Sequence, residues 1–243
     1  MRWSFRLGSL FGIPVYLHFT FLLLLGFVAL TRLVYGGIGA AAGALLLVSS
    51  VFGLVVMHEM GHALAARRFG IGTRDVTLLP IGGVARLERN PGNPRQELWI
   101  ALAGPAVNLV LAGLFGIVLA LTGGSFFAQL LAINLALFAF NMLPAFPMDG
   151  GRVLRALLAR RMGQRPATEI AVSVGKGMAV LLGVAGLFWN PMLILIAFFV
   201  WTSGNQELRP AWSWVPPAEP RWPYDGPGGP VAPRVVRVRV HRD

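Results

Sequence analysis

The sequence contains the stretch His58-Glu59-Met60-Gly61-His62 directly after a long run without any Asp, Glu, Lys or Arg. An α-helix advances about 100° per residue, so the two histidines lie on one face, one turn apart, and can reach the same metal ion. Glu59 lies at the flank of that face, where it can contact a water molecule without occupying a ligand position. The pattern predicts two zinc ligands and a catalytic base inside an apolar helix. The alternative is a polar cluster that only joins helices by hydrogen bonds.

Composition places that helix in a membrane protein. Hydrophobic residues make up 56% of the 243 residues and charged residues 13%, whereas a soluble domain carries about 25% charged residues. A spanning helix needs roughly 20 apolar residues, and charge-free runs cover residues 7–31, 33–57, 98–148 and 177–206. The predicted fold is an all-α membrane protein, a bundle of about six transmembrane helices with a short membrane-associated strand or loop segment. We expect the spans at residues 10–31, 41–66, 97–121, 126–143, 171–189 and 192–206.

The arginines indicate an orientation. With the N-terminus in the cytoplasm, the arginines of residues 67–95 and 152–165 fall in cytoplasmic loops, and only Arg32 lies outside. The net charge of +11 is then mostly a topology signal that also suits anionic lipid headgroups. The chain has no basic face with groove-reading or base-stacking elements, so no nucleic-acid partner is expected. The excess of Arg over Lys, with many Ala and Gly, indicates a prokaryotic cell membrane.

The chain divides into one polytopic membrane domain, residues 1–208, and a tail, residues 209–243, rich in Pro, Gly and Arg. This composition predicts a flexible cytoplasmic tail, with a short strand or a lipid contact near residues 234–240 as the alternative. His241, in the tail, is expected to be solvated. The chain contains no cysteine, which excludes disulfides and thiol chemistry.

A catalytic zinc ion normally has three protein ligands, and the third has to come from another segment. Asp149 follows an apolar run in the pattern Asn141-x-x-Pro144-x-x-Pro147-x-Asp149-Gly150. The prolines and glycines predict a non-helical stretch at the membrane edge that can turn the carboxylate back toward the ion. The local sequence supports an ordinary solvated Asp at a helix end equally well.

Two further features are ambiguous. His18, in the first predicted span, is expected to be packed and hydrogen-bonded rather than to bind metal. Residues 75–88 indicate a pair of strands whose edge could hold an extended peptide by strand addition. A plain amphipathic loop is the alternative for this segment.

The two motifs, about 80 residues apart, together resemble the site-2 protease family of intramembrane metalloproteases. Residues 79–84 and 103–108 are also similar to that family, and the resemblance covers residues 1–205. It implies that His58, His62 and Asp149 bind one Zn²⁺ per chain, that Glu59 is the base, and that Asn141 holds the substrate backbone or the transition state. Many members carry a PDZ domain or paired CBS domains, and we expect neither within these 243 residues.

The expected function is that of an intramembrane zinc metalloprotease that hydrolyses peptide bonds in or near transmembrane segments of membrane-protein substrates. One rival is a membrane metal transporter that uses the histidine pair, but the spans offer no polar path to the far side. The other is an inactive scaffold of the same fold, and the intact Glu59 argues against it.

Overall fold

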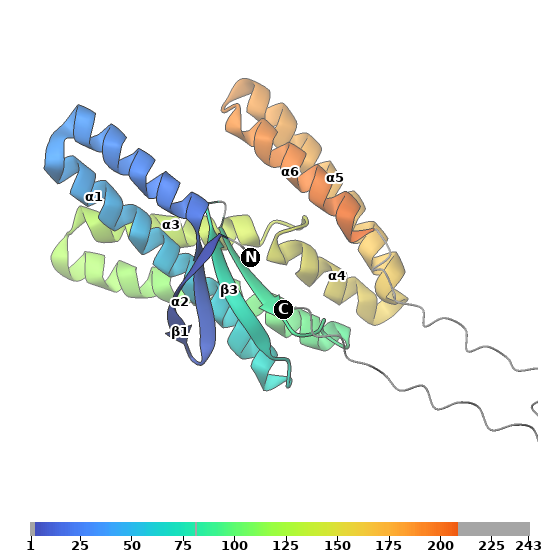
Figure 1. The fold of residues 1–243 in the computed structure, drawn as a ribbon. Coiled ribbons are helices and arrows are strands. Elements are labelled where there is room, and N and C mark those ends of the chain that lie inside the picture. The colour runs from blue at the N-terminus through green and yellow to red at the C-terminus, as the bar shows by residue number, and fades with distance from the viewer. Residues whose placement is uncertain (1–2, 81, 209–243) are drawn as a thin grey trace, which may run out of the picture. The chain divides into compact units, whose positions relative to one another are not determined.

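The computed structural model describes residues 3–80 and 82–208, which are mostly helical with one small sheet (Figure 1). The predicted tail from residue 209 lies outside the described residues. The helices are α1 (Phe19–Arg68), α2 (Pro94–Thr122), α3 (Ser125–Asn141), α4 (Asp149–Met162), α5 (Gln164–Phe188) and α6 (Met192–Glu207).

Helix α1 contains two helical arms joined at Gly37, whose φ of 75° and ψ of −174° are not helical. Glycine has no Cβ and adopts this left-handed φ at little cost, so the chain folds back there into the blue hairpin of Figure 1. Length and composition qualify α1, α2 and α5 for crossing a membrane, and α3 is a shorter apolar helix. A mostly helical fold with helices long and apolar enough to cross a membrane is therefore confirmed, while the number of six spans stays a prediction.

The sheet has four strands in the order β1 (Ser4–Leu10), β2 (Ile13–His18), β3 (Thr73–Leu79) and β4 (Gly82–Leu87). β2 and β3 pair in parallel, and the outer pairs are antiparallel. The strand pair expected at residues 75–88 is confirmed. The first span, expected from residue 10, was placed too early, because residues 13–18 form β2 and the helix begins at Phe19.

The strand β2 forms because its apolar residues alternate. Ile13, Val15 and Leu17 are buried and their neighbours are not fully buried, as the two-residue period of a strand requires. These side chains pack with Met60 and Ala63 of α1 in one core cluster. The sheet is therefore packed on the turn of α1 that carries the histidines, and β3 and β4 both contact α1.

Of the remaining helices, α2 and α3 contact α1. α2 packs on α1 and α3, α4 packs on α2 and α5, and α5 pairs with α6. Asn93 caps α2 by accepting a hydrogen bond from the Gln96 backbone N–H at 2.9 Å. The stretch around Asp149, predicted to be non-helical, is instead a helix: Asp149 is the first residue of α4, and the irregular segment is residues 142–148.

Candidate metal centre

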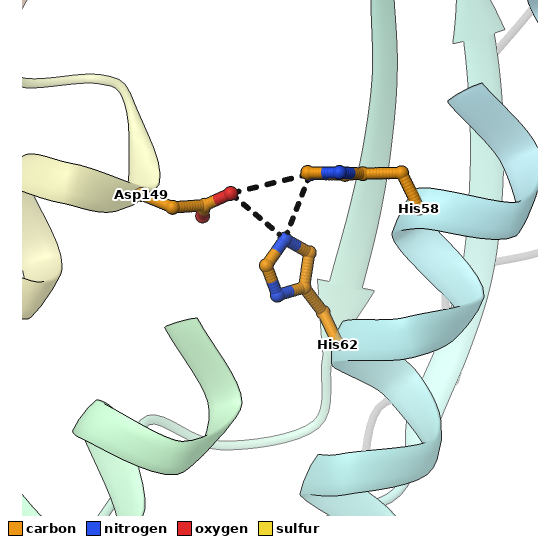
Figure 2. A group of neighbouring side chains, drawn as sticks. All are labelled: His58, His62 and Asp149. Carbon is orange, nitrogen blue, oxygen red and sulfur yellow. Dashed lines mark hydrogen bonds and ion pairs between the residues drawn. The ribbon is translucent and has the colours of Figure 1, made fainter. Parts of the chain in front are cut away.

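The two histidines of α1 point toward the same place, as Figure 2 shows. His58 and His62 are both 6% exposed, and their Nε2 atoms lie 3.0 Å apart. The spacing of four residues produces this geometry, because it places both rings on one helix face.

Asp149 completes the cluster from the start of α4 (Figure 2). Its Oδ2 lies 3.2 Å from His58 Nε2 and 3.1 Å from His62 Nε2, and its side chain is buried. The structure thus brings together the three residues that the sequence singled out, across 87 positions of the chain.

The three atoms suit a metal ion. Ligands at 2.0–2.1 Å from a tetrahedral zinc ion are separated from one another by about 3.3 Å, close to the 3.0–3.2 Å found here. His62 Nδ1 donates a hydrogen bond to the Ile100 carbonyl at 2.7 Å, so Nε2 of the neutral ring presents a lone pair. A lone pair and a carboxylate oxygen repel each other at 3.1 Å unless a cation or a proton lies between them, so the arrangement favours a bound cation.

Groups around the cluster orient its members. The Ile100 carbonyl fixes the tautomer of His62, as outer partners of metal-binding histidines commonly do. Arg152 Nη1 lies 4.0 Å from the other oxygen of Asp149, Oδ1.

Helix α2 forms the floor of the cluster at Gly104. A Cβ at this position would lie 2.7 Å from His58 Nε2 and still closer to the ring of His62. Only a residue without a side chain permits the two histidines to approach α2 this closely. The small residue is therefore part of the site, although it offers no chemical group.

Glu59 and Asn141 line the same cleft, which has a volume of about 630 Å³ and also contains the three clustered residues. The Glu59 side chain lies against Gly83 of β4, where a Cβ would come within 2.7 Å of its Cγ. Asn141 Nδ2 donates to the Leu137 carbonyl at 3.0 Å, which leaves its Oδ1 available. A smaller cavity of about 200 Å³ adjoins Glu59 and His62 and is also lined by Asn90 and Arg152.

His18 lies outside the cluster. Its Nδ1 is 2.8 Å from the Thr20 hydroxyl and accepts from the Thr20 backbone N–H, so it caps the start of α1. This geometry agrees with the predicted packed role.

Sequence reasoning did not assign a role to Asn108 of α2. The residue is fully buried and borders the 630 Å³ cleft, and neither of its side-chain polar atoms has a partner among residues 3–80 and 82–208. The sequence did contain a signal for Asn108, because it places a polar amide in the middle of an apolar helix, four residues after Gly104. The Ile100 carbonyl could not have been found, because a backbone group has no sequence signature.

Comparisons with known proteins agree on one family. The model of peptidase family M50 matches residues 46–131 and 120–182. A zinc metalloprotease of Methanocaldococcus jannaschii is 38% identical over 215 residues, which cover 86% of this chain and 62% of the relative. A Synechocystis relative is 36% identical over 238 residues, which cover 87% of this chain and 61% of that protein. The chain thus spans about three fifths of the length of these curated relatives.

A solved structure is also similar. The site-2 protease from Methanocaldococcus jannaschii superimposes with a TM-score of 0.62 at 38% identity, covering 85% of this chain and 96% of that chain.

Proposed function

Because the chain belongs to peptidase family M50, which includes the site-2 proteases, we propose that it is an intramembrane zinc metalloprotease that hydrolyses peptide bonds in or near transmembrane segments of membrane-protein substrates. One observation carries the proposal: the side chains of two histidines, an aspartate and Glu59 converge in one cleft beside apolar helices.

His58, His62 and Asp149 would hold one Zn²⁺ per chain, leaving a fourth position open for water or substrate. When bound, zinc lowers the pKa of water toward about 7 and polarises the scissile carbonyl. Glu59 takes a proton from the attacking water and delivers it to the leaving amine as the peptide bond breaks. Asn141, on the wall of the same cleft, holds the substrate backbone or the transition state.

Water has to reach a site that lies well inside α1. His58 is ten residues from Arg68, the end of the helix, or roughly 15 Å at 1.5 Å per residue. The smaller cavity, lined in part by Asn90, Arg152 and Glu59, would serve as a route for water to the base. We assign the entrance of this route to the cytoplasmic side, together with the N- and C-termini of the chain.

A helical substrate hides its carbonyls in its own hydrogen bonds and has to unwind before cleavage. β4 is the last strand in the order β1-β2-β3-β4 and lines the cleft beside Glu59. An extended substrate segment could therefore pair with β4 by strand addition. The partners are then a transmembrane protein substrate and the lipid bilayer of a prokaryotic cell.

Two variants test the proposal. Glu59→Gln keeps the shape of the side chain but cannot take the proton, so the protein should hold one zinc while hydrolysis of a membrane-spanning substrate falls by about 10²-fold or more. Asp149→Ala removes a ligand, so zinc content and hydrolysis should both fall.

The measurements are zinc analysis and substrate cleavage on wild type and both variants, purified in detergent. Asp149→Ala with full zinc and full activity would remove Asp149 from the metal site. A transporter that uses the histidine pair would show metal flux in vesicles that does not depend on Glu59, and no cleavage.

A further inference from the structure

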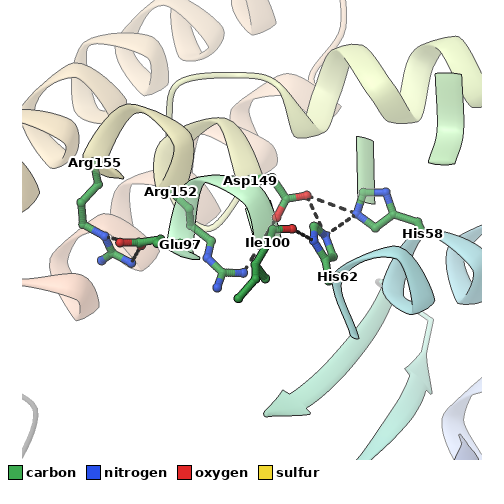
Figure 3. Close-up of polar contacts among 7 residues, drawn as sticks. All are labelled: His58, His62, Glu97, Ile100, Asp149, Arg152 and Arg155. Carbon is green, nitrogen blue, oxygen red and sulfur yellow. Dashed lines mark hydrogen bonds and ion pairs between the residues drawn. The ribbon is translucent and has the colours of Figure 1, made fainter. Parts of the chain in front are cut away.

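An ion pair between the buried Glu97 and the partly buried Arg155 joins α2 to α4 next to the metal centre (Figure 3). Glu97, in the first turn of α2, is 4% exposed. Arg155 of α4 donates to Glu97 Oε1 from both Nε, at 2.8 Å, and Nη2. Gln164 donates to the other oxygen, Oε2, at 3.2 Å. Every oxygen of this buried carboxylate is therefore paired.

Arg155 has two further contacts. Its guanidinium carbon lies 4.9 Å from the centre of the Phe146 ring, in the irregular segment that leads into Asp149. Its Nη1 donates to Glu207, at the end of α6, at 2.6 Å, and Glu207 is much more exposed than Glu97. Burial opposes the charge on Arg155, but the two carboxylates outweigh it and raise the pKa of its guanidinium, so the residue stays charged.

The Glu97–Arg155 pair joins the two helices that position metal ligands, α2 through Ile100 and α4 through Asp149. Ile100, three residues after Glu97 on α2, supplies the carbonyl that accepts from His62. Asp149 begins the helix that carries Arg155 and lies six residues earlier, or about 9 Å along its axis. Because α4 packs on α2 and α5, the position of Asp149 relative to the histidines depends on the α2–α4 contact.

We propose that Glu97 and Arg155 are positioning residues, which hold the α2 turn that orients His62 at a fixed distance from the start of α4 and thereby set the zinc affinity of the site. This inference rests on the proposed function. Neither side chain touches a metal ligand, and the pair acts through the backbones of α2 and α4.

The energetics favour positioning over simple stabilisation. Burying two charges costs desolvation, and well-packed apolar residues often hold helices together equally well. The Arg155 guanidinium, in contrast, joins Glu97 through two N–H groups and stacks on Phe146, which fixes direction as well as distance. Removing Arg155 alone leaves the buried Glu97 carboxylate without a counter-charge, and removing Glu97 as well relieves that penalty, so the two substitutions should be strongly coupled.

The test measures zinc affinity by competition with a chelator in four variants: Arg155→Gln, Glu97→Gln, the double variant, and Glu207→Gln. Each of the first two should bind zinc about tenfold more weakly or worse, the scale seen for outer partners of metal ligands. The double variant should lose about as much as one single substitution, because both substitutions remove the same contact between α2 and α4. Glu207→Gln, the matched control, breaks only the exposed pair and should stay within about twofold of wild type.

Two additional readouts separate positioning from loss of fold. Thermal melting reports whether each variant is folded. The visible spectrum of the cobalt(II)-substituted protein reports the ligand set, and it should change in Arg155→Gln but not in Glu207→Gln. If the single variants do not fold, the double variant serves in their place, with about tenfold weaker zinc binding expected.

Wild-type zinc affinity and an unchanged cobalt spectrum in Arg155→Gln, or in the double variant if the single ones do not fold, would overturn the inference while leaving the proposed function intact. The inference would also be overturned if the fold-losses of zinc affinity in the two single variants multiplied in the double variant. An equal loss of zinc affinity in Glu207→Gln would overturn it too, because that result would assign the effect to α6. A wild-type protein that holds no zinc would instead overturn the proposed function and this inference with it.

Discussion

Individual side chains show why the metal centre is so tightly defined. His58, His62 and Asp149 meet at 3.0–3.2 Å only because their surroundings permit it. Gly104 leaves room for the rings, and the Ile100 carbonyl fixes the proton of His62. A small change in the size of a residue that surrounds the three ligands should therefore weaken zinc binding as strongly as the loss of a polar group.

Gly104→Ala tests this view. The added Cβ would overlap the rings of both His58 and His62. Both rings are buried and cannot turn away freely, so the two histidines have to move away from α2. We expect zinc affinity to fall by about tenfold or more and the free energy of unfolding to fall by about 1–3 kcal/mol from overpacking.

The matched control is Gly113→Ala on the same helix, where a Cβ would meet no atom within 4 Å. That variant should keep wild-type zinc affinity, measured by chelator competition. Equal zinc affinity in the two variants would mean that α2 does not press on the histidines.

The residues of the cluster were predictable to different degrees. The spacing of His58 and His62 defines their geometry inside a single helix, so the sequence alone was sufficient. The local sequence left Asp149 undecided, and the resemblance between the paired motifs and the site-2 protease family, a family now confirmed, was needed to choose it. The Glu97–Arg155 pair depends on how α2 and α4 pack, which no local pattern encodes.

At the level of elements, two segments were predicted wrongly for physical reasons. Residues 13–18 were assigned to a span because they belong to a charge-free run, although their alternating burial is that of a strand. Residues 152–165 were expected to form a cytoplasmic loop, because they lie between the predicted spans at 126–143 and 171–189 and carry several arginines. In the structure, Arg152, Arg155, Arg160 and Arg161 lie on helix α4, whose Ala156 and Ala159 are buried, so the charge pattern did not reveal the secondary structure.

His18 lies at the boundary between β2 and α1, where its side chain caps the start of the helix. A side chain that caps the start of a helix contributes about 0.5–2 kcal/mol to stability. His18→Ala should therefore lower the free energy of unfolding by that amount while the zinc content stays at one per chain.

His18→Asn is the control, because asparagine is a preferred capping residue and should restore most of the stability. Thermal or denaturant unfolding and zinc analysis measure the two effects separately. A loss of zinc in both variants would instead make His18 a ligand.

At the scale of the whole molecule, the length of α2 separates the Glu97–Arg155 pair from the turn between α2 and α3. α2 has 29 residues and is about 43 Å long at 1.5 Å per residue, which exceeds a hydrocarbon core of about 30 Å. Glu97 lies near one end of this helix and Ser125 follows the other end. The length of α2 therefore separates the Glu97–Arg155 pair from the turn between α2 and α3 by about the thickness of a membrane.

This separation predicts the outcome of cysteine labelling, for which the natural absence of cysteine is an advantage. Gln164 hydrogen-bonds to Glu97, so the exposed Arg165 next to it lies at the Glu97 end of α2. Arg165→Cys and Ser125→Cys should react with a membrane-impermeant maleimide from opposite sides, Arg165→Cys from the cytoplasm, because the arginine-rich segments belong there. Labelling of both from one side would mean that α2 does not cross the bilayer. Labelling of Ser125→Cys from the cytoplasm and Arg165→Cys from outside would invert the topology and move the water entrance beside Arg152 to the opposite face.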